Sequence, residues 1–424
     1  MRISLALLVV GFLGFVTCKK TFEGDQVVSL FPKTNEHIEF IQSLEDTIDL
    51  VDFWSPKYAN NVQTHKSVDI RFPRENLEYL KGLVEEHGIE YEVKIPDVQE
   101  LIDNQVKGRK NLKDSSTYNY NVYHPIEEIT SWTQEIAAAY PSLVTLSVLG
   151  DSFEGRNIPM LTISTNKDNP RLFLDCGFHA REWISPAFCQ CFTRNLLKGY
   201  GSDPVFTKQL NKLTFHIVPV VNVDGYAYSW TDQRLWRKTR SNYGTRCNGT
   251  DPNRNCNAYW GGPGSSPNPC SDIYYGPAME SEIEVHALAN FIRDNAQTIA
   301  AYITVHSYSQ MIIYPYSYTY ELSATHNVLD KYAKQMKDAI YNVFSKEYTY
   351  GSGAGLLYAA AGGSDDFAYD AGVPLSYTYE LRDTGEYGFL LPENQIEETC
   401  VETTAGMKAI ADGALELWHN KLNE

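Results

Sequence analysis

Positive charge is scarce in this chain, which has 36 Lys and Arg residues against 53 Asp and Glu residues and a net charge of −17. Nucleic acids and anionic membranes are bound through basic patches, so this balance argues against both as partners. An acidic surface is compatible with attracting cationic peptides, although it serves solubility equally well. We therefore expect neither nucleic acid nor membrane among the partners.

Long apolar runs are missing after the first residues of the chain. One apolar run covers residues 5–16, with Arg2 before it and small residues and Lys19 after it. This pattern is typical of a secretory signal peptide over residues 1–18, and the run is too short to span a bilayer. We expect a secreted, extracellular, soluble protein, in a setting such as a digestive lumen. Eight cysteines and the glycosylation sequon at Asn248 fit that route.

Internal repeats and low-complexity tracts are absent too, and 424 residues with 43% apolar composition suffice for one small and one large domain. In residues 19–110, strand-like runs at 67–72 and 90–95 accompany helical spacing at 73–87 and 98–106, which predicts a small α+β domain.

A polar stretch over residues 105–116 joins the two domains. It has no apolar periodicity and carries four basic residues, namely Lys107, Arg109, Lys110 and Lys113. Such stretches are exposed and are readily cleaved by proteases. A simple linker is one interpretation, but the basic residues favour a site of proteolytic activation. We predict a signal peptide over 1–18, a first domain over 19–110 and a larger domain over 111–424.

The larger domain alternates apolar strand-like runs with helical stretches. The runs lie at Leu143–Leu149, Leu172–Asp175, Leu213–Val221, Tyr302–His306 and Leu375–Tyr379. This alternation predicts an α/β fold with a mixed, mostly parallel twisted sheet that is covered by helices. His179, His306 and Glu380 each follow the last apolar residues of such a run, where open α/β sheets bind ligands.

The turn after Leu172–Asp175 contains His179 and Glu182, and Ser185-Pro186 then opens a helical stretch. An imidazole and a carboxylate three residues apart on one turn can grip a metal ion from the same side. With a third ligand and one open position for water, this is the layout of a catalytic zinc. Alone, the His-x-x-Glu pattern is also compatible with an ordinary exposed turn.

The motifs around this turn resemble those of the pancreatic-type zinc metallocarboxypeptidases, with B-type specificity. The resemblance covers essentially the whole chain and rests on Gly-Phe-His-Ala-Arg-Glu-Trp-Ile-Ser-Pro (177–186), Trp-Arg-Lys-Thr-Arg-Ser (236–241), Asp-Pro-Asn-Arg-Asn (251–255), His-Ser-Tyr-Ser-Gln (306–310) and Tyr-Glu-Leu-Arg-Asp-Thr-Gly (379–385). It implies a metallocarboxypeptidase-like fold, with residues 19–110 as a pro-domain.

The resemblance also implies the residues of the zinc centre. One Zn²⁺ per chain would be bound by His179, Glu182 and His306, with Asp251 accepting the other ring N–H of His179. Glu380 would take a proton from a water and pass it to the leaving amine, although the residues leave open a nucleophilic carboxylate that forms an anhydride. Arg237 would stabilise the oxyanion of the tetrahedral intermediate.

An exopeptidase must further recognise a free C-terminal carboxylate, for which a guanidinium is the natural bidentate partner. By resemblance, the residues that bind substrate at this end are Asn253, Arg254, Tyr358, Tyr308 and Arg181. The side-chain pocket would be formed by Ser317, Gly353, Ser364 and Asp365, with Asp365 at its floor. The Ser-Asp-Asp run at 364–366 can equally cap a helix. In the pro-domain, the carboxylate of Asp52 would pair with Arg254 in place of a substrate carboxylate.

Seven cysteines remain once Cys18 leaves with the signal peptide, so at least one is unpaired in a monomer. The resemblance implies disulfides Cys176–Cys189 and Cys247–Cys270. Pairing among Cys191, Cys256 and Cys400 stays open at this point.

We conclude from the sequence that the chain is a secreted, monomeric zymogen of a zinc metallocarboxypeptidase. Its partners would be peptides or proteins that end in Lys or Arg and a trypsin-like activating protease. Two alternatives differ in function: an A-type enzyme that releases apolar C-terminal residues, and a catalytically silent protein that binds peptide C-termini.

Overall fold

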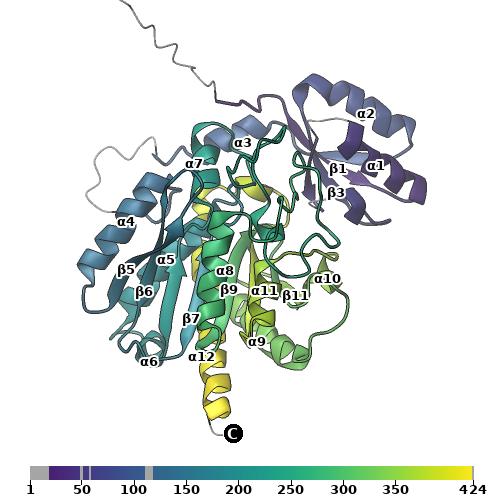
Figure 1. Ribbon diagram of the computed structural model, residues 1–424. Helices are drawn as coiled ribbons and strands as arrows, with labels where there is room; N and C mark the ends of the chain where they lie inside the picture. Colours follow the sequence, from purple (N-terminus) through teal and green to yellow (C-terminus); the bar gives the residue numbers. More distant parts are fainter. Residues whose placement is uncertain (1–18, 48–50, 57–58, 110–117, 423–424) are drawn as a thin grey trace, which may run out of the picture.

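The computed structural model describes residues 19–47, 51–56, 59–109 and 118–422. The predicted signal peptide and residues 110–117 of the basic linker lie outside these ranges. Figure 1 shows a small domain, in purple and blue, against one end of a larger one. In the described part of the chain, no helix combines the length and apolarity needed to cross a membrane.

The small domain is α+β, as predicted. Its four strands pair antiparallel in the order β2-β3-β1-β4, and Val28, Leu30, Ile70 and Phe72 are buried between the sheet and its helices. The elements are β1 (Gln26–Phe31), α1 (Asn35–Thr47), β2 (Asp52–Ser55), β3 (Val68–Phe72), α2 (Leu77–Glu86), β4 (Glu90–Ile95) and α3 (Val98–Asn104).

The large domain contains one eight-stranded sheet in the order β11-β10-β12-β9-β7-β8-β6-β5. Strands β8, β7, β9 and β12 pair in parallel at its centre, whereas β5, β6 and the β10–β12 pair are antiparallel. The strands are β5 (Val144–Asp151), β6 (Asn157–Ile163), β7 (Arg171–Cys176), β8 (Thr214–Val218), β9 (Ile299–Ser307), β10 (Met311–Tyr314), β11 (Thr349–Ser352) and β12 (Ser376–Leu381). The predicted mixed sheet is thereby confirmed.

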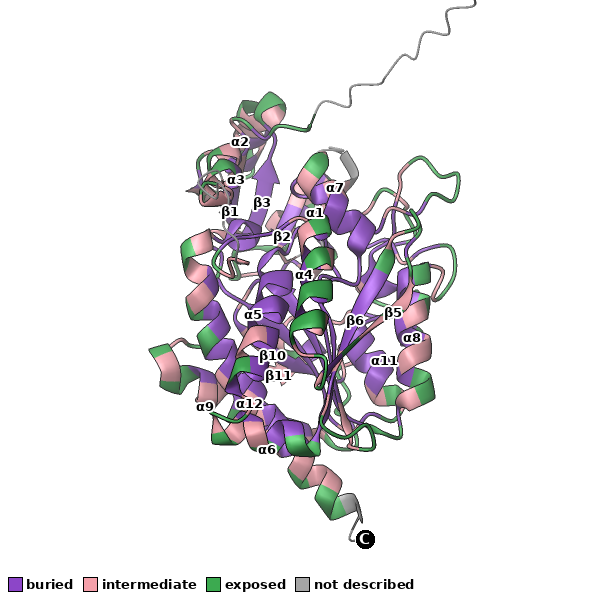
Figure 2. Ribbon diagram, turned by 90° about the vertical axis from the view of Figure 1, so that its left-hand side faces the viewer, coloured by how far each residue is buried: buried purple, intermediate pink, exposed green. Residues whose placement is uncertain are grey.

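Helices cover this sheet on both faces, as Figure 2 shows. On one face, α5 packs on β7, α9 on β10 and α12 on β9; on the other, α11 packs on β12 and α8 on β5. The helices of the domain are α4 (Ile126–Ala139), α5 (Ile184–Gly199), α6 (Pro204–Lys212), α7 (Val223–Thr231), α8 (Ile283–Asn295), α9 (His326–Phe344), α10 (Gly353–Leu356), α11 (Ser364–Asp370) and α12 (Ile396–Leu422).

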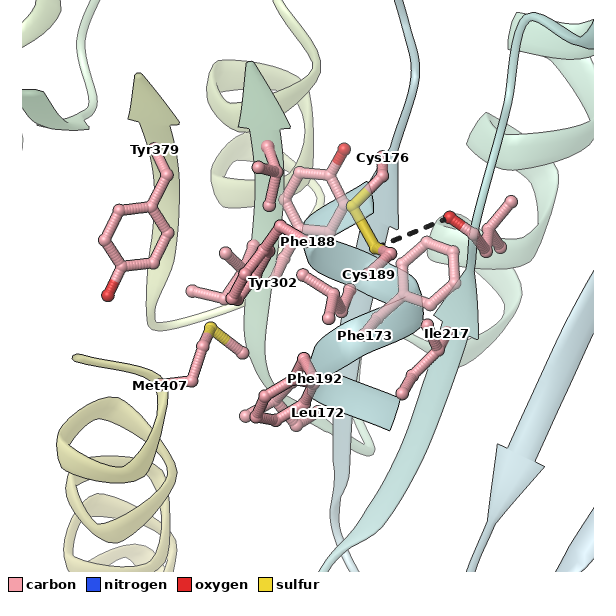
Figure 3. Close-up of a cluster of buried hydrophobic side chains, with 14 of the residues drawn as sticks. Leu172, Phe173, Cys176, Phe188, Cys189, Phe192, Ile217, Tyr302, Tyr379 and Met407 are labelled. Atoms are coloured by element: carbon pink, nitrogen blue, oxygen red, sulfur yellow. Dashed lines mark hydrogen bonds between the residues drawn. A yellow bond between two sulfur atoms is a disulfide. The ribbon is translucent and has the colours of Figure 1, made fainter. Parts of the chain in front are cut away.

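Apolar runs form the central strands because helices bury both faces of the sheet. Leu172, Phe173 and Leu174 on β7 are fully buried, and Figure 3 shows Phe188 and Phe192 of α5 beside this strand. Burying one such side chain stabilises the fold by about 1.5–3 kcal/mol. The central strands therefore provide a rigid support for the side chains at their ends.

Disulfides tie α5 to its neighbours. Cys176 at the end of β7 is bonded to Cys189 on α5 (Figure 3), and Cys191 on the same helix is bonded to Cys400 on α12. Cys247 is bonded to Cys270. The structure thus pairs Cys191 with Cys400 and leaves Cys256 as a buried free thiol.

Candidate functional site

The turn between β7 and α5 carries two of the predicted metal ligands. Gly177 opens this turn with φ +68°, and a Cβ atom there would lie 3.0–3.1 Å from Val220 atoms. Glycine adopts this left-handed conformation without strain. The Gly177 N–H donates to the Ser185 hydroxyl at 3.0 Å, and that hydroxyl donates to the Val305 carbonyl on β9. The turn is therefore anchored to the strand that carries His306.

His179, Glu182 and His306 meet in one buried cluster, as the sequence predicts. Their ligand atoms lie within 4.8 Å of one another, and no other such group occurs among the described residues. Nδ1 of His179 lies 2.8 Å from Oε1 of Glu182 and 3.0 Å from Nδ1 of His306. Burial lowers the pKa of His306 and so favours the neutral imidazole that binds a metal.

Two imidazole nitrogens and one carboxylate are the donor set of catalytic zinc sites, which keep a further position open for water. Two ring nitrogens facing each other at 3.0 Å also need a cation or a shared proton between them. The residues present therefore fit zinc.

Asp251 connects this cluster to Arg237. Its Oδ1 lies 3.0 Å from Nε2 of His179, and its Oδ2 accepts a 2.8 Å hydrogen bond from Nη2 of Arg237. Burial disfavours the charged carboxylate, but Arg237 and His179 outweigh that cost and hold the pKa of Asp251 well below its usual range. Nη1 of Arg237 lies 3.6 Å from Oε1 of Glu182. The guanidinium is thus fixed beside the metal ligands.

Glu380 lies opposite His306 on the neighbouring strand, because β12 and β9 pair in parallel with these two residues in register. It is 7% exposed and lines a cavity that also reaches His179 and Arg237. The cavity contains further predicted substrate-binding residues, namely Asn253, Arg254, Tyr308, Ser317, Gly353, Tyr358 and Asp365. The strand ends therefore bring the predicted base, the metal cluster and these residues to one place.

Arg254 and Asn253 lie in a short 3₁₀ turn over Pro252–Arg254. Arg254 donates to the backbone carbonyls of Gly264 at 2.8 Å and Asn253 at 2.7 Å, which hold its guanidinium at the cavity wall. Oδ1 of Asn253 accepts from the N–H of Ser364 at the start of α11. The predicted carboxylate clamp is thereby attached to the helix that carries Asp365.

Asp52 of the small domain binds Arg181 and not Arg254, so that expectation was wrong. Nη1 of Arg181 donates to both carboxylate oxygens, at 3.0 and 3.1 Å. Burial disfavours the Asp52 charge, but Arg181 and Arg71 outweigh it and lower its pKa. Trp54, which follows on β2, lines the cavity together with Ser55 and Pro56. The small domain therefore covers the cavity beside Arg181, one of the predicted substrate-binding residues.

Tyr308 belongs to this covered region. It is 3% exposed, and its ring meets the edge of Phe389 at a centroid distance of 5.1 Å. Phe389 also contacts Trp54, at 5.1 Å between ring centroids. These three rings form a continuous aromatic contact between the domains.

Asp365 and Asp366 have different environments. Asp366 accepts from the backbone N–H groups of Ser317 and Tyr318, at 2.9 and 3.0 Å. Asp365 lines the cavity, and its buried Oδ2 has no hydrogen-bond partner within the described ranges. Burial raises its pKa. No side chain caps α11, whose N-cap is Gly363, so the helix-cap interpretation of the Ser-Asp-Asp run was wrong.

Space in the pocket depends on Gly353. A Cβ atom at this position would lie within 3.0 Å of the Ser317 backbone and closer still to its hydroxyl. Sequence reasoning missed Thr378, which lines the cavity two residues before Glu380. The period of two in a strand was the available signal, because it puts both side chains on one face of β12.

Comparisons with known proteins agree with this geometry. The zinc carboxypeptidase family model matches residues 129–406, and the carboxypeptidase activation peptide model matches residues 28–105. Carboxypeptidase B of Homo sapiens is 45% identical over 397 residues, covering 93% of this chain and 94% of that protein. Carboxypeptidase A2 of Rattus norvegicus is 40% identical over 414 residues, covering 96% and 98%.

Solved structures give the same result. Thrombin activatable fibrinolysis inhibitor is 39% identical with a TM-score of 0.88, covering 93% of this chain and all of that one. Carboxypeptidase A from Helicoverpa armigera is 28% identical with a TM-score of 0.82, covering 93% and 98%. The match to the activation peptide precedes the segments that carry the metal cluster. The chain therefore belongs to the zinc carboxypeptidase family and is the zymogen of a zinc-dependent peptidase.

Proposed function

We propose that the activated enzyme releases Lys and Arg from the C-termini of peptides and proteins. The observation that carries this proposal is the buried Asp365 side chain, which lines the cavity and whose Oδ2 has no hydrogen-bond partner within the described ranges. A substrate guanidinium or ammonium would supply the missing partner, whereas an apolar side chain would leave the charge buried and unpaired, at a cost of several kcal/mol. Identity of 45% to a carboxypeptidase B supports the same specificity.

We propose that His179, Glu182 and His306 hold the zinc. When bound, zinc lowers the pKa of a water and polarises the scissile carbonyl. Glu380 would accept the proton of that water and return it to the leaving amine. Arg237, fixed by Asp251, would donate to the oxygen on which negative charge develops.

Recognition of the substrate terminus is proposed for Arg254, Asn253 and Tyr358, with Tyr308 beside them and Arg181 along the entry path. The guanidinium of Arg254 is held by backbone carbonyls, so it would meet a carboxylate without losing much side-chain freedom. This clamp would restrict cleavage to the last peptide bond. Ser317 would add polarity to the pocket and Gly353 would leave it room.

The zymogen state is proposed to depend on residues 19–110, which would be released by a trypsin-like protease from a catalytic domain over 111–424. Asp52 pairs with Arg181, and Trp54 lines the cavity, so a substrate could not enter along this path. Arg109 is tied to Glu128 by hydrogen bonds of 2.7 and 2.8 Å. We therefore propose that the protease cuts at another basic residue of the linker. A signal peptide over 1–18 would direct the chain to an extracellular location.

The test is an assay of trypsin-activated protein on peptides that end in Arg or in Phe. We expect a preference for Arg on the order of 10²–10³ in kcat/KM, less than the strongest polar sites because this pocket opens to water. A preference for Phe would establish the A-type alternative. Zinc-loaded protein that cleaves neither peptide would establish the silent binder.

A further inference from the structure

The two candidate zinc histidines differ in what lies behind them. Nε2 of His179 lies 3.0 Å from the Asp251 carboxylate. Nε2 of His306 lies 3.2 Å from the hydroxyl of Thr304, two residues earlier on β9. Both rings turn Nδ1 toward the metal cluster. Nε2 of His306 therefore faces a hydroxyl, whereas Nε2 of His179 faces a carboxylate.

Thr304 is itself bound to a buried acid. Its hydroxyl donates to Oδ1 of Asp175 at 2.7 Å, and Asp175 and Thr304 are register partners on the parallel strands β7 and β9. All three side chains are at most 1% exposed. Water therefore does not compete for these contacts.

The direction of the hydrogen bonds follows from the number of protons. His306 must present a lone pair on Nδ1 to bind a metal, so its proton sits on Nε2. A hydroxyl has one proton and can accept as well as donate. Because a carboxylate accepts the Thr304 proton, the Thr304 oxygen is free to accept from His306.

We propose that Thr304 is a positioning residue for the zinc site, which orients the His306 ring and fixes its tautomer through a relay from Nε2–H to the Thr304 hydroxyl to Asp175. The pattern of strand pairing supports this assignment. Thr304 and His306 point to the same face of β9, and Asp175 reaches that face from the adjacent strand in register. All three residues of the relay therefore lie on the central strands β7 and β9, and none lies in a loop.

The proposal rests on the proposed role of His306 as a zinc ligand, which is tested separately by the zinc content of a folded His306→Ala variant. The experiment is a chelator competition that measures the zinc dissociation constant of full-length zymogen variants. We expect Thr304→Val, which keeps the shape and removes the hydroxyl, to bind zinc about 10–100-fold more weakly. Thr304→Ser keeps the hydroxyl and should bind zinc nearly as tightly as the unsubstituted protein.

Thr162→Val is the matched control. Thr162 contacts Nδ1 of His216 at 3.0 Å in the same sheet, away from the metal cluster. This variant loses a contact between a threonine and a histidine, but its zinc affinity should not change. Thermal unfolding of the metal-free proteins separates a general loss of stability from a loss at the site.

Three results would overturn the proposal. The first is unchanged zinc affinity in Thr304→Val, and the second is an equal loss in Thr304→Ser, which would assign the effect to the methyl group. If Thr304→Val does not fold, Asp175→Asn tests the relay from its other end, since an amide is a weaker acceptor than a carboxylate. Unchanged affinity in that variant is the third contrary result.

Discussion

Asp52 of the pro-domain and Arg181 of the catalytic domain are joined by two hydrogen bonds, at 3.0 and 3.1 Å, from one guanidinium nitrogen to both carboxylate oxygens. Arg181 is 1% exposed, so this pair lies within the interface. The guanidinium carbon of Arg181 also lies over the Phe389 ring, 4.1 Å from its centroid. The contact connects a charge on β2 directly to Arg181, a proposed substrate-binding residue.

Removing this charge should loosen the pro-domain. Hydrogen bonds to charged groups contribute about 1.5–3 kcal/mol, so Asp52→Asn is expected to weaken pro-domain binding about 10–100-fold after the linker is cut. Inhibition of activated enzyme by added pro-domain measures this change. Glu90→Gln is the control, because Glu90 pairs with Lys33 on the exposed surface of the pro-domain, and neither residue contacts Asp52. Equal weakening by both variants would contradict a specific role of the Asp52–Arg181 pair.

Glu380→Gln should abolish nearly all hydrolysis while zinc content stays at one per chain. The amide cannot accept the proton that the proposed base must take. Elemental analysis and turnover of a peptide that ends in Arg measure the two properties. Near-normal turnover would remove Glu380 from the mechanism.

Asp365→Ile should lower kcat/KM for C-terminal Arg by about 10²–10³ and raise it for apolar residues. The substitution removes the buried carboxylate and lines the pocket with apolar surface. Zinc content should not change. An equal loss on Arg and Phe peptides would mean that Asp365 is structural, and an unchanged preference would mean that another acid fills the role.

The preference for Arg over Phe should decline as the pH falls. Burial raises the pKa of Asp365 above its ordinary value of 3.8, so the free enzyme loses this charge at a higher pH than an exposed Asp would. The carboxyl then no longer pairs with a guanidinium, whereas binding of Phe does not require the charge. The ratio of the two kcat/KM values against pH measures this effect. In Asp365→Asn the ratio should be low and independent of pH, and a falling ratio there would assign the titration to another group.

Zinc removal should lower the thermal stability of the zymogen, because a metal that binds the folded state stabilises it by mass action, by about 2.7 kcal/mol at a hundredfold excess over Kd. Differential scanning calorimetry with and without chelator measures the shift in Tm. His306→Ala should show no dependence on chelator. A folded His306→Ala variant that retains full zinc would overturn the ligand set.

Much of the fold followed from apolar runs. The strands that carry Leu172, Tyr302 and Tyr377 were predicted because burial on both faces demands continuous apolar residues. Strands β6, β10 and β11 were not predicted, since β10 and β11 have four residues each and β6 contains Pro159. Short or proline-containing strands give a weak pattern.

The site was predictable where a family motif marks each contributing segment, and the contact between the pro-domain and the catalytic domain was not predicted correctly. His179 and Glu182 are three residues apart, whereas Asp52 finds Arg181 only through domain docking. Docking depends on the fit of two surfaces and leaves no periodic signal. The pairing of Cys191 with Cys400 spans 209 residues, and connectivity over such a distance cannot be deduced from sequence.

The metal ligands already lie within 4.8 Å of one another while the pro-domain covers the cavity. We therefore expect activation to uncover the cavity without rearranging the metal ligands. In kinetic terms, the appearance of activity after cleavage should follow the dissociation of the pro-domain as a single exponential without a lag. The lifetime of the complex between the cleaved pro-domain and the catalytic domain, which contacts such as Asp52–Arg181 would set, then determines how quickly activity appears.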